Sequence, residues 1–173
     1  EEYTPIERYQ DMKELYHDIA IAYQKAIRAF YDAGCRYLQL DDTSWGEFCD
    51  ADKRKTYKER GFDLEEIAKS YVDMINLALE AKPADMTITM HICRGNFRST
   101  WFSSGRYEPV AETLFGHCQV DGFFLEYDSE RSGDFSPLRY IKEQKVVLGL
   151  ITSKFPELED KEEVKERIKE AEK

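Results

Sequence analysis

A histidine and a cysteine stand two residues apart in the segment Met86-Thr-Ile-Thr-Met-His-Ile-Cys93. On a β-strand, residues i and i+2 point to the same face, so the side chains of His91 and Cys93 could reach one ion. Imidazole nitrogen and thiolate sulfur are ligands of Zn²⁺, at distances of about 2.0 to 2.3 Å. The pair by itself also has an ordinary interpretation, because buried strands often carry a cysteine and a histidine often closes a strand.

A carboxylate follows a second apolar segment, Asp121-Gly-Phe-Phe-Leu-Glu-Tyr-Asp128. Glu126 comes directly after aromatic and aliphatic residues, where a charge is costly unless it is paired or bound to something. The following carboxylates, Asp128 and Glu130, are expected to be rim residues in solvent. With His91 and Cys93, Glu126 would complete a three-ligand zinc set that leaves the fourth position open, as in catalytic zinc sites.

The elements that must position these residues alternate between helices and strands. Apolar residues recur every three or four positions from about Ile6 to Ala33, which predicts an amphipathic helix. Residues 35–40 predict a strand that ends on two aspartates, and Asp63 with Glu66 predicts the start of a second helix. The later predicted elements are a strand to Cys93, a helix near 110–118, a strand at 123–127, a short helix from Ser136-Pro137, a strand at 145–152 and a helix capped by Asp160.

This alternation predicts an α/β fold with a parallel sheet, and strands this apolar are typical of a sheet covered on both faces. The polar residues follow the C-terminal ends of the strands, where (β/α)₈ TIM barrels carry their chemistry. We therefore expect residues 1–173 to form a single part of such a barrel, about four consecutive βα units. An open doubly wound sheet is the alternative, disfavoured because no glycine-rich phosphate loop follows any strand.

Composition limits the classes of partner. The 173 residues are 42% hydrophobic, enough for a globular domain with a core. Lys and Arg total 25 against 35 for Asp and Glu, and a net charge of −10 disfavours nucleic acid and anionic membranes as partners. No apolar stretch approaches the roughly 20 residues of a membrane helix. We expect small-molecule substrates.

The cysteines and the chain ends bear on compartment and completeness. The four cysteines show no CxxC and no regular spacing, which predicts a reducing, cytoplasmic compartment. The sequence starts at Glu1 without Met or a signal peptide and stops on a charged helix, so we expect both ends to be cut from a longer chain. A half barrel has unpaired sheet edges, and these make a homo-oligomer an open possibility.

With these residues in view, nearly the whole chain resembles the C-terminal part of the cobalamin-independent methionine synthase family, most closely its short single-barrel members. Gln39-Leu40-Asp41-Asp42 stands where the family has Gln-Ile-Asp-Glu. His91-Ile92-Cys93 matches its His-Met-Cys, and Leu125-Glu126 matches its Ile-Glu. The resemblance implies methyl transfer from a methylfolate to the thiol of homocysteine.

The resemblance also implies roles for particular residues. His91, Cys93 and Glu126 would be zinc ligands, with Glu126 the one expected to exchange, and Asp41 would help to hold homocysteine. Apart from the resemblance, Asp41-Asp42-Thr43-Ser44 could simply be turn and helix-capping chemistry.

Two features depart from the family pattern. The family's fourth ligand is a cysteine on the final barrel strand, and no such segment occurs in these 173 residues. Its Asp-x-His-Ser segment reads Thr152-Ser153-Lys154 here, so the histidine implicated in proton handling is absent. The role of Lys154 stays open.

Several other residues have both a functional and an ordinary interpretation. Arg94, Asn96 and Arg98 follow the metal strand and could clamp a substrate carboxylate, or form surface salt bridges. Trp45 and Trp101 could stack on a pterin, or pack near the barrel mouth. Two competing hypotheses for the whole chain remain: a zinc enzyme that alkylates another thiol or uses another donor, and a non-catalytic metal-binding barrel.

Overall fold

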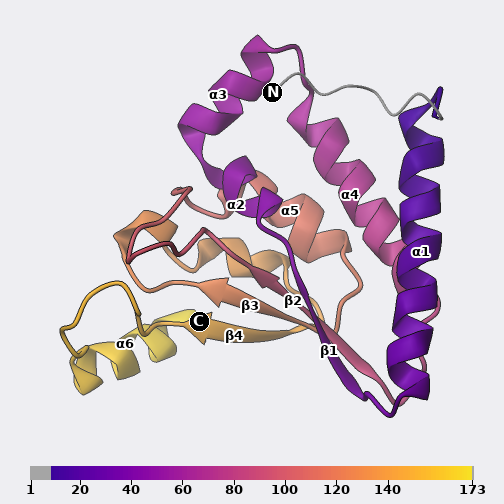
Figure 1. Ribbon diagram of the computed structural model, residues 1–173. Coiled ribbons are helices and arrows are strands. Elements are labelled where there is room, and N and C mark those ends of the chain that lie inside the picture. The colour runs from indigo at the N-terminus through magenta and orange to yellow at the C-terminus, as the bar shows by residue number, and fades with distance from the viewer. Residues whose placement is uncertain (1–8, 173) are drawn as a thin grey trace.

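The computed structural model describes residues 9–172, and these form an α/β fold around a parallel four-stranded sheet (Figure 1). The strands are β1 (Tyr37–Asp41), β2 (Thr87–Ile92), β3 (Gly122–Glu126) and β4 (Lys145–Gly149), and they lie side by side in chain order. The α-helices are α1 (Met12–Asp32), α2 (Ser44–Cys49), α3 (Ala51–Glu59), α4 (Leu64–Leu79), α5 (Glu108–His117) and α6 (Lys161–Ala171), with 3₁₀ turns η1 (Glu130–Ser132) and η2 (Ser136–Tyr140). The predicted alternation of strands and helices is confirmed.

Aspartate side chains cap the N-termini of several helices. Asp63 accepts hydrogen bonds from the backbone N–H groups of Glu65 and Glu66 at the start of α4, and Asp160 caps α6 in the same way. Such caps satisfy N–H groups that have no partner inside the helix, and each stabilises by about 1 kcal/mol. The predicted first helix begins later than expected, at Met12, where Asp11 is the cap. The first residues of that prediction, 6–8, lie outside the described part of the chain.

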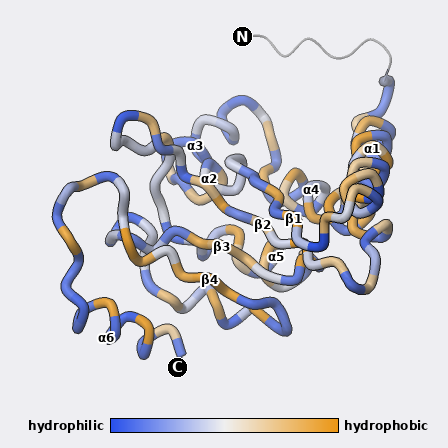
Figure 2. The backbone as a smooth tube through the Cα atoms, turned by 60° about the horizontal axis from the view of Figure 1, so that its bottom comes forward, coloured by the Kyte–Doolittle hydropathy of each residue, from blue (hydrophilic) through white to orange (hydrophobic). Residues whose placement is uncertain are grey.

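The hydrophobic core lies between the sheet and the helices α1, α4 and α5, which stand side by side along one of its faces (Figure 1). On that face Ile88, Ile92 and Phe123 are fully buried, and burying each such side chain contributes about 1.5 to 3 kcal/mol. Figure 2 shows the corresponding hydrophobic stretches along β3 and β4. Successive residues of a strand point to alternate faces, so the strand residues next to these buried ones point to the opposite face of the sheet.

The opposite face of the sheet is not covered by any helix of the described residues. Tyr37 is 53% exposed and Val147 is 45% exposed on that face, and the outer edges of β1 and β4 pair with no strand in residues 9–172. The expectation of a sheet covered on both faces is therefore wrong for this part of the chain. The apolar composition reflects one deeply buried face, and the second face mixes polar and apolar residues.

No helix among the described residues is long and apolar enough to cross a membrane.

A close approach between α2 and the end of β2 supplies a stability prediction. A Cβ added at Gly46 would lie 2.6 Å from the backbone oxygen of Cys93 and 2.8 Å from Oγ of Ser103. Gly46→Ala must therefore displace backbone, and overpacking of this kind costs about 1 to 3 kcal/mol. Chemical denaturation should show this loss, whereas Gly116→Ala, whose added Cβ meets nothing within 4 Å, serves as the control.

Candidate metal site

Asp41, His91 and Cys93 gather at the C-terminal edge of the sheet. Asp41 on β1 is the register partner of His91 on β2, and Cys93 follows two residues later on the same face. One ligand atom from each of the three residues lies within 4.8 Å of the other two. The histidine and the cysteine are partly buried and the aspartate is exposed, so the cluster is accessible from one side.

The imidazole of His91 is oriented by the neighbouring strand. Its Nδ1 lies 3.3 Å from the carbonyl oxygen of Phe124 on β3. Because a carbonyl oxygen can only accept, this contact requires the proton on Nδ1 and leaves the lone pair of Nε2 available. Metal-ligating histidines characteristically donate their other ring N–H in this way, which fixes the tautomer and the orientation of the ring.

The sulfur of Cys93 accepts a hydrogen bond from the backbone N–H of Gly95, at 3.3 Å. This contact helps to fix the position of the sulfur, and a cysteine binds metals as its thiolate. By contrast, burial raises the pKa of Cys49 to about 11 and that of Cys118 to about 12, so both stay protonated at neutral pH. All four cysteines are free thiols, and only Cys93 belongs to a cluster of candidate ligands in the described residues.

The donor set of the cluster fits a borderline-soft divalent ion. One nitrogen, one sulfur and one carboxylate oxygen match the ligands of zinc, whereas calcium and magnesium prefer oxygen alone. Three protein ligands leave room for a further ligand, which is the arrangement of catalytic zinc sites. These residues could therefore hold a metal ion of the zinc type.

Glu126 lies at the same edge of the sheet but is not in this cluster. It follows Leu125, the register partner of Ile92, so β3 places it beside the Cys93 end of β2. Its Oε1 accepts from the backbone N–H of Arg94 at 3.1 Å, and its Oε2 pairs with Arg131 at 2.7 Å. The structure thus brings together the predicted His91 and Cys93, adds Asp41 to them, and holds Glu126 in ion pairs.

The backbone of Glu126 is fixed by a tyrosine. The hydroxyl of Tyr107 accepts from the N–H of Glu126 at 3.0 Å and donates to its carbonyl oxygen at 3.3 Å. Tyr107 is fully buried, and burial raises its pKa to about 12, so it remains a neutral phenol. Tyr107 could not be predicted as a site residue, because nothing near it in the chain indicates that it contacts the end of β3.

Asp128 is buried, contrary to the prediction of a solvent-exposed rim residue. Its side chain pairs with Arg131 at 2.8 Å and with Lys154 at 3.3 Å. The two cations compensate a charge that would otherwise be costly to bury. Glu130 is exposed, as predicted. Arg131 was not recognised as a site residue; its spacing of three residues from Asp128 was the available signal.

Burial decides two of the other predicted roles, and a hydrogen bond decides a third. Arg94 is 1% exposed with its guanidinium 4.3 Å from the centre of the Tyr107 ring, so a role in clamping substrate is wrong. Trp45 is fully buried in edge contacts with Phe48 and Tyr71, which excludes it from stacking on a ligand. Asp42 accepts from the N–H of Ser44 at 3.0 Å, so its turn interpretation is confirmed.

The loops that flank the cluster are joined to each other. Asn96, after β2, donates to the hydroxyl of Ser153, after β4, at 2.9 Å. Trp101 is 45% exposed, and the guanidinium of Arg131 lies 5.1 Å from its ring. Arg98 remains on the exposed surface, with a positive φ of 51°. Asn96, Arg98 and Trp101 are thus all exposed in the loop after β2.

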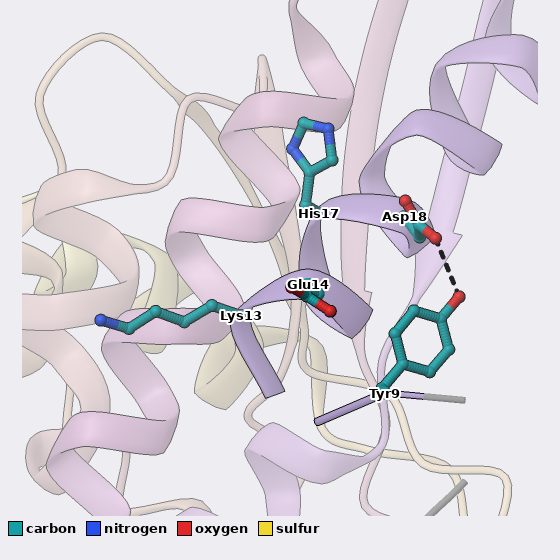
Figure 3. Close-up of a pocket in the computed structure, with 5 residues that line it drawn as sticks. All are labelled: Tyr9, Lys13, Glu14, His17 and Asp18. Atoms are coloured by element: carbon teal, nitrogen blue, oxygen red, sulfur yellow. Dashed lines mark hydrogen bonds between the residues drawn. The ribbon is translucent and has the colours of Figure 1, made fainter. Parts of the chain in front are cut away.

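A hollow in the surface lies apart from this candidate metal site. It is lined by Tyr9, Lys13, Glu14, His17 and Asp18, at the N-terminal turns of α1 (Figure 3). The hydroxyl of Tyr9 donates to Asp18 at 2.9 Å. None of the residues at the C-terminal edge of the sheet lines this hollow.

Comparisons with known proteins give the following relatives. No protein-family model matches the chain. Two Bacillus subtilis (strain 168) proteins, YxjH and YxjG, both described as uncharacterized, are 56% identical over 165 residues and 51% identical over 168 residues. These alignments cover 94% and 95% of this chain and 44% of each relative, so the chain spans less than half the length of the relatives it matches.

A solved structure is similar over the same extent. It is a Listeria monocytogenes protein described as a "Putative Vitamin-B12 Independent Methionine Synthase", with 51% sequence identity and a TM-score of 0.73. The match covers 93% of this chain and 44% of that one. Over nearly all of its own length, the chain is therefore similar in sequence and fold to a protein described as a methionine synthase that works without vitamin B12.

Proposed function

We propose that the protein of which these residues form a part is a zinc-dependent methyltransferase. It would transfer a methyl group from 5-methyltetrahydrofolate, in its polyglutamate form, to the thiol of homocysteine and so make methionine. The observation that carries this proposal is the cluster of Asp41, His91 and Cys93 at the C-terminal edge of a parallel sheet. The similarity to the Listeria protein supports the same reaction class.

Zinc would supply the chemistry that a thiol substrate needs. A free thiol has a pKa of about 8.5 and is mostly protonated at neutral pH, and coordination to zinc deprotonates it. The chain's own residues would hold the ion through Nε2 of His91 and Sγ of Cys93. We propose Glu126 as the third and exchangeable ligand. By resemblance to the family, the fourth would be a cysteine that these 173 residues do not contain.

Asp41 would bind the ammonium group of homocysteine. Its exposed carboxylate lies on the open side of the cluster, next to His91, where an amino-thiol would place its amine. Because Asp41 also belongs to the cluster, it is an alternative third metal ligand. The variant Asp41→Asn separates substrate binding from metal binding.

Asp41→Asn is expected to weaken homocysteine binding while the zinc content stays unchanged. A charge-assisted hydrogen bond is worth about 1.5 to 3 kcal/mol, which corresponds to a loss of affinity of roughly 10- to 150-fold. Calorimetric titration with homocysteine and metal analysis of the same sample measure both quantities, with Asp42→Asn as the neighbouring control. A fall in zinc content would make Asp41 a metal ligand, and unchanged homocysteine affinity would remove it from the substrate site.

We also propose that the four βα units belong to a (β/α)₈ barrel. Three features support this: the uncovered face of the sheet, the unpaired edges of β1 and β4 within residues 9–172, and the length of the relatives. In addition, a largely apolar groove of about 160 Å³ lies beside β1, lined by residues of α1, β1 and α4 that include Ile19, Leu40 and Met74, with Asp41 and Asp42 at the end of β1. Another βα unit packed against β1 would fill it.

A second candidate function follows from Lys154. This lysine stands where the family has a histidine for proton handling, and its ammonium group is buried against Asp128 and Glu126. A buried, paired lysine is a poor substitute for a histidine that exchanges protons. The second candidate is therefore a related zinc enzyme that alkylates another thiol or uses another methyl donor.

The test is a methyl-transfer assay on a polypeptide that contains this chain and completes the sheet. With zinc, homocysteine and methylfolate, methionine should form, and a chelator should abolish it. Methionine formation that persists without zinc would contradict the mechanism. Metal binding without methionine formation, but with alkylation of another thiol, would establish the second candidate.

The four free thiols, Cys35, Cys49, Cys93 and Cys118, support the prediction of a reducing, cytoplasmic compartment.

A further inference from the structure

We propose that Arg131 and Lys154 are positioning residues that compete with the metal for the carboxylate of Glu126. By holding Glu126 in ion pairs outside the Asp41–His91–Cys93 cluster, they make it a weak ligand that can leave and return. Asp128 sets the strength of this competition, because it binds the same two cations. This inference rests on the proposed zinc site and assigns roles to three residues around it.

The four side chains form one group of ion pairs with little exposure to solvent. Arg131 Nη2 lies 2.7 Å from Glu126 Oε2 and 2.8 Å from Asp128 Oδ1. Lys154 Nζ lies 3.3 Å from Asp128 Oδ2 and 3.6 Å from Glu126 Oε2. Side-chain exposure is 9% for Arg131, 6% for Lys154, 6% for Asp128 and 16% for Glu126. Such burial limits screening by water, so each charge acts strongly on its neighbours.

The two carboxylates share their partners unequally. Both contact the same Nη2 atom of Arg131, and Lys154 lies nearer to Asp128 than to Glu126. Asp128 therefore draws positive charge away from Glu126. Glu126 keeps one oxygen, Oε1, that has only a neutral donor, the N–H of Arg94. That oxygen is the one best able to turn toward a metal beside Cys93.

This sharing predicts effects of opposite sign. Removing the charge of Lys154 leaves Glu126 less paired, so its carboxylate becomes a better metal ligand. Removing the charge of Asp128 transfers both cations to Glu126, so its carboxylate becomes a worse one. General damage to the fold would weaken metal binding in both variants, which separates a positioning role from a structural one.

The experiment measures the zinc affinity of a polypeptide that contains this chain and completes the sheet, by competition with a chromophoric chelator, and follows the coordination by the absorption of bound Co²⁺. Lys154→Met should bind zinc about tenfold more tightly than the wild-type chain, and Asp128→Asn about tenfold more weakly, the scale at which outer partners of metal ligands act. Lys154→Arg keeps the charge and should restore wild-type affinity. In a Glu126→Gln background, both differences should disappear, because the ligand through which they act is gone.

Thermal unfolding verifies that each variant is folded. If Lys154→Met does not fold, Lys154→Gln keeps a donor for Asp128 and carries the same prediction. Equal weakening in Lys154→Met and Asp128→Asn, unchanged affinity in both, or differences that persist in Glu126→Gln would overturn the inference. Loss of zinc in Cys93→Ser with any of these results would leave the proposed site intact. Absence of zinc binding in the wild-type polypeptide that contains this chain and completes the sheet would contradict the proposed function itself.

Discussion

Cys93→Ser and His91→Ala are each expected to bind zinc at least about 100-fold more weakly than the wild-type chain. Loss of an outer partner already costs up to about 100-fold, and loss of a ligand should cost no less. A serine hydroxyl does not ionise at neutral pH, so it cannot replace a cysteine thiolate as a metal ligand. The His91 variant removes the nitrogen that the contact with Phe124 leaves available.

The chain offers matched controls for both substitutions. Cys35 lies before β1, at the opposite end of the sheet, with its sulfur 3.1 Å from the carbonyl oxygen of Tyr37. His117 is exposed in the last turn of α5. Cys35→Ser and His117→Ala should therefore retain zinc, as measured by metal analysis after dialysis. Full zinc occupancy in both Cys93→Ser and His91→Ala would show that the site is assigned to the wrong residues.

The 173 residues taken alone are expected to show no methyl transfer to homocysteine. The proposed barrel supplies the fourth ligand and the methylfolate site from other parts of the protein. The open sheet face, with Tyr37 and Val147 exposed, and the unpaired edges of β1 and β4 in residues 9–172 should also cause self-association.

Size-exclusion chromatography and the methyl-transfer assay test this expectation together. The chain should elute as oligomers and produce no methionine, whereas a polypeptide that completes the sheet should be active. A compact monomer of the 173 residues that makes methionine would refute the proposal that they are part of a larger barrel.

The regular elements could be predicted from the sequence because their signals are local. Asp63 and Asp160 cap helices as expected, and the apolar period of α4 marks a helix that buries Ile75 and Ala78. Helix α3 was not predicted, since none of its residues is buried and it has no apolar stripe to detect. Helix α2 has only six residues, too few for a helical period to be recognised.

The strand residues of the candidate site could be predicted from the sequence, whereas its ion pairs could not. His91 and Cys93 come together because they share one strand, and Asp41 joins them through parallel register. The orientation of Glu126 depends on Arg131 and Lys154, and Lys154 comes from a loop after a different strand. Contacts of that kind follow from the packed fold, and no spacing in the sequence signals them.

We propose that His91 and Cys93 hold a metal ion to which a substrate thiol binds. The most direct test is the absorption of the Co²⁺-loaded polypeptide that contains this chain and completes the sheet, measured before and after addition of homocysteine. We expect a sulfur-to-cobalt charge-transfer band from Cys93 that is absent in Cys93→Ser. The band should grow with homocysteine and not with homoserine, its analogue without the thiol. A band that survives in Cys93→Ser, or a spectrum that does not change with homocysteine, would contradict it.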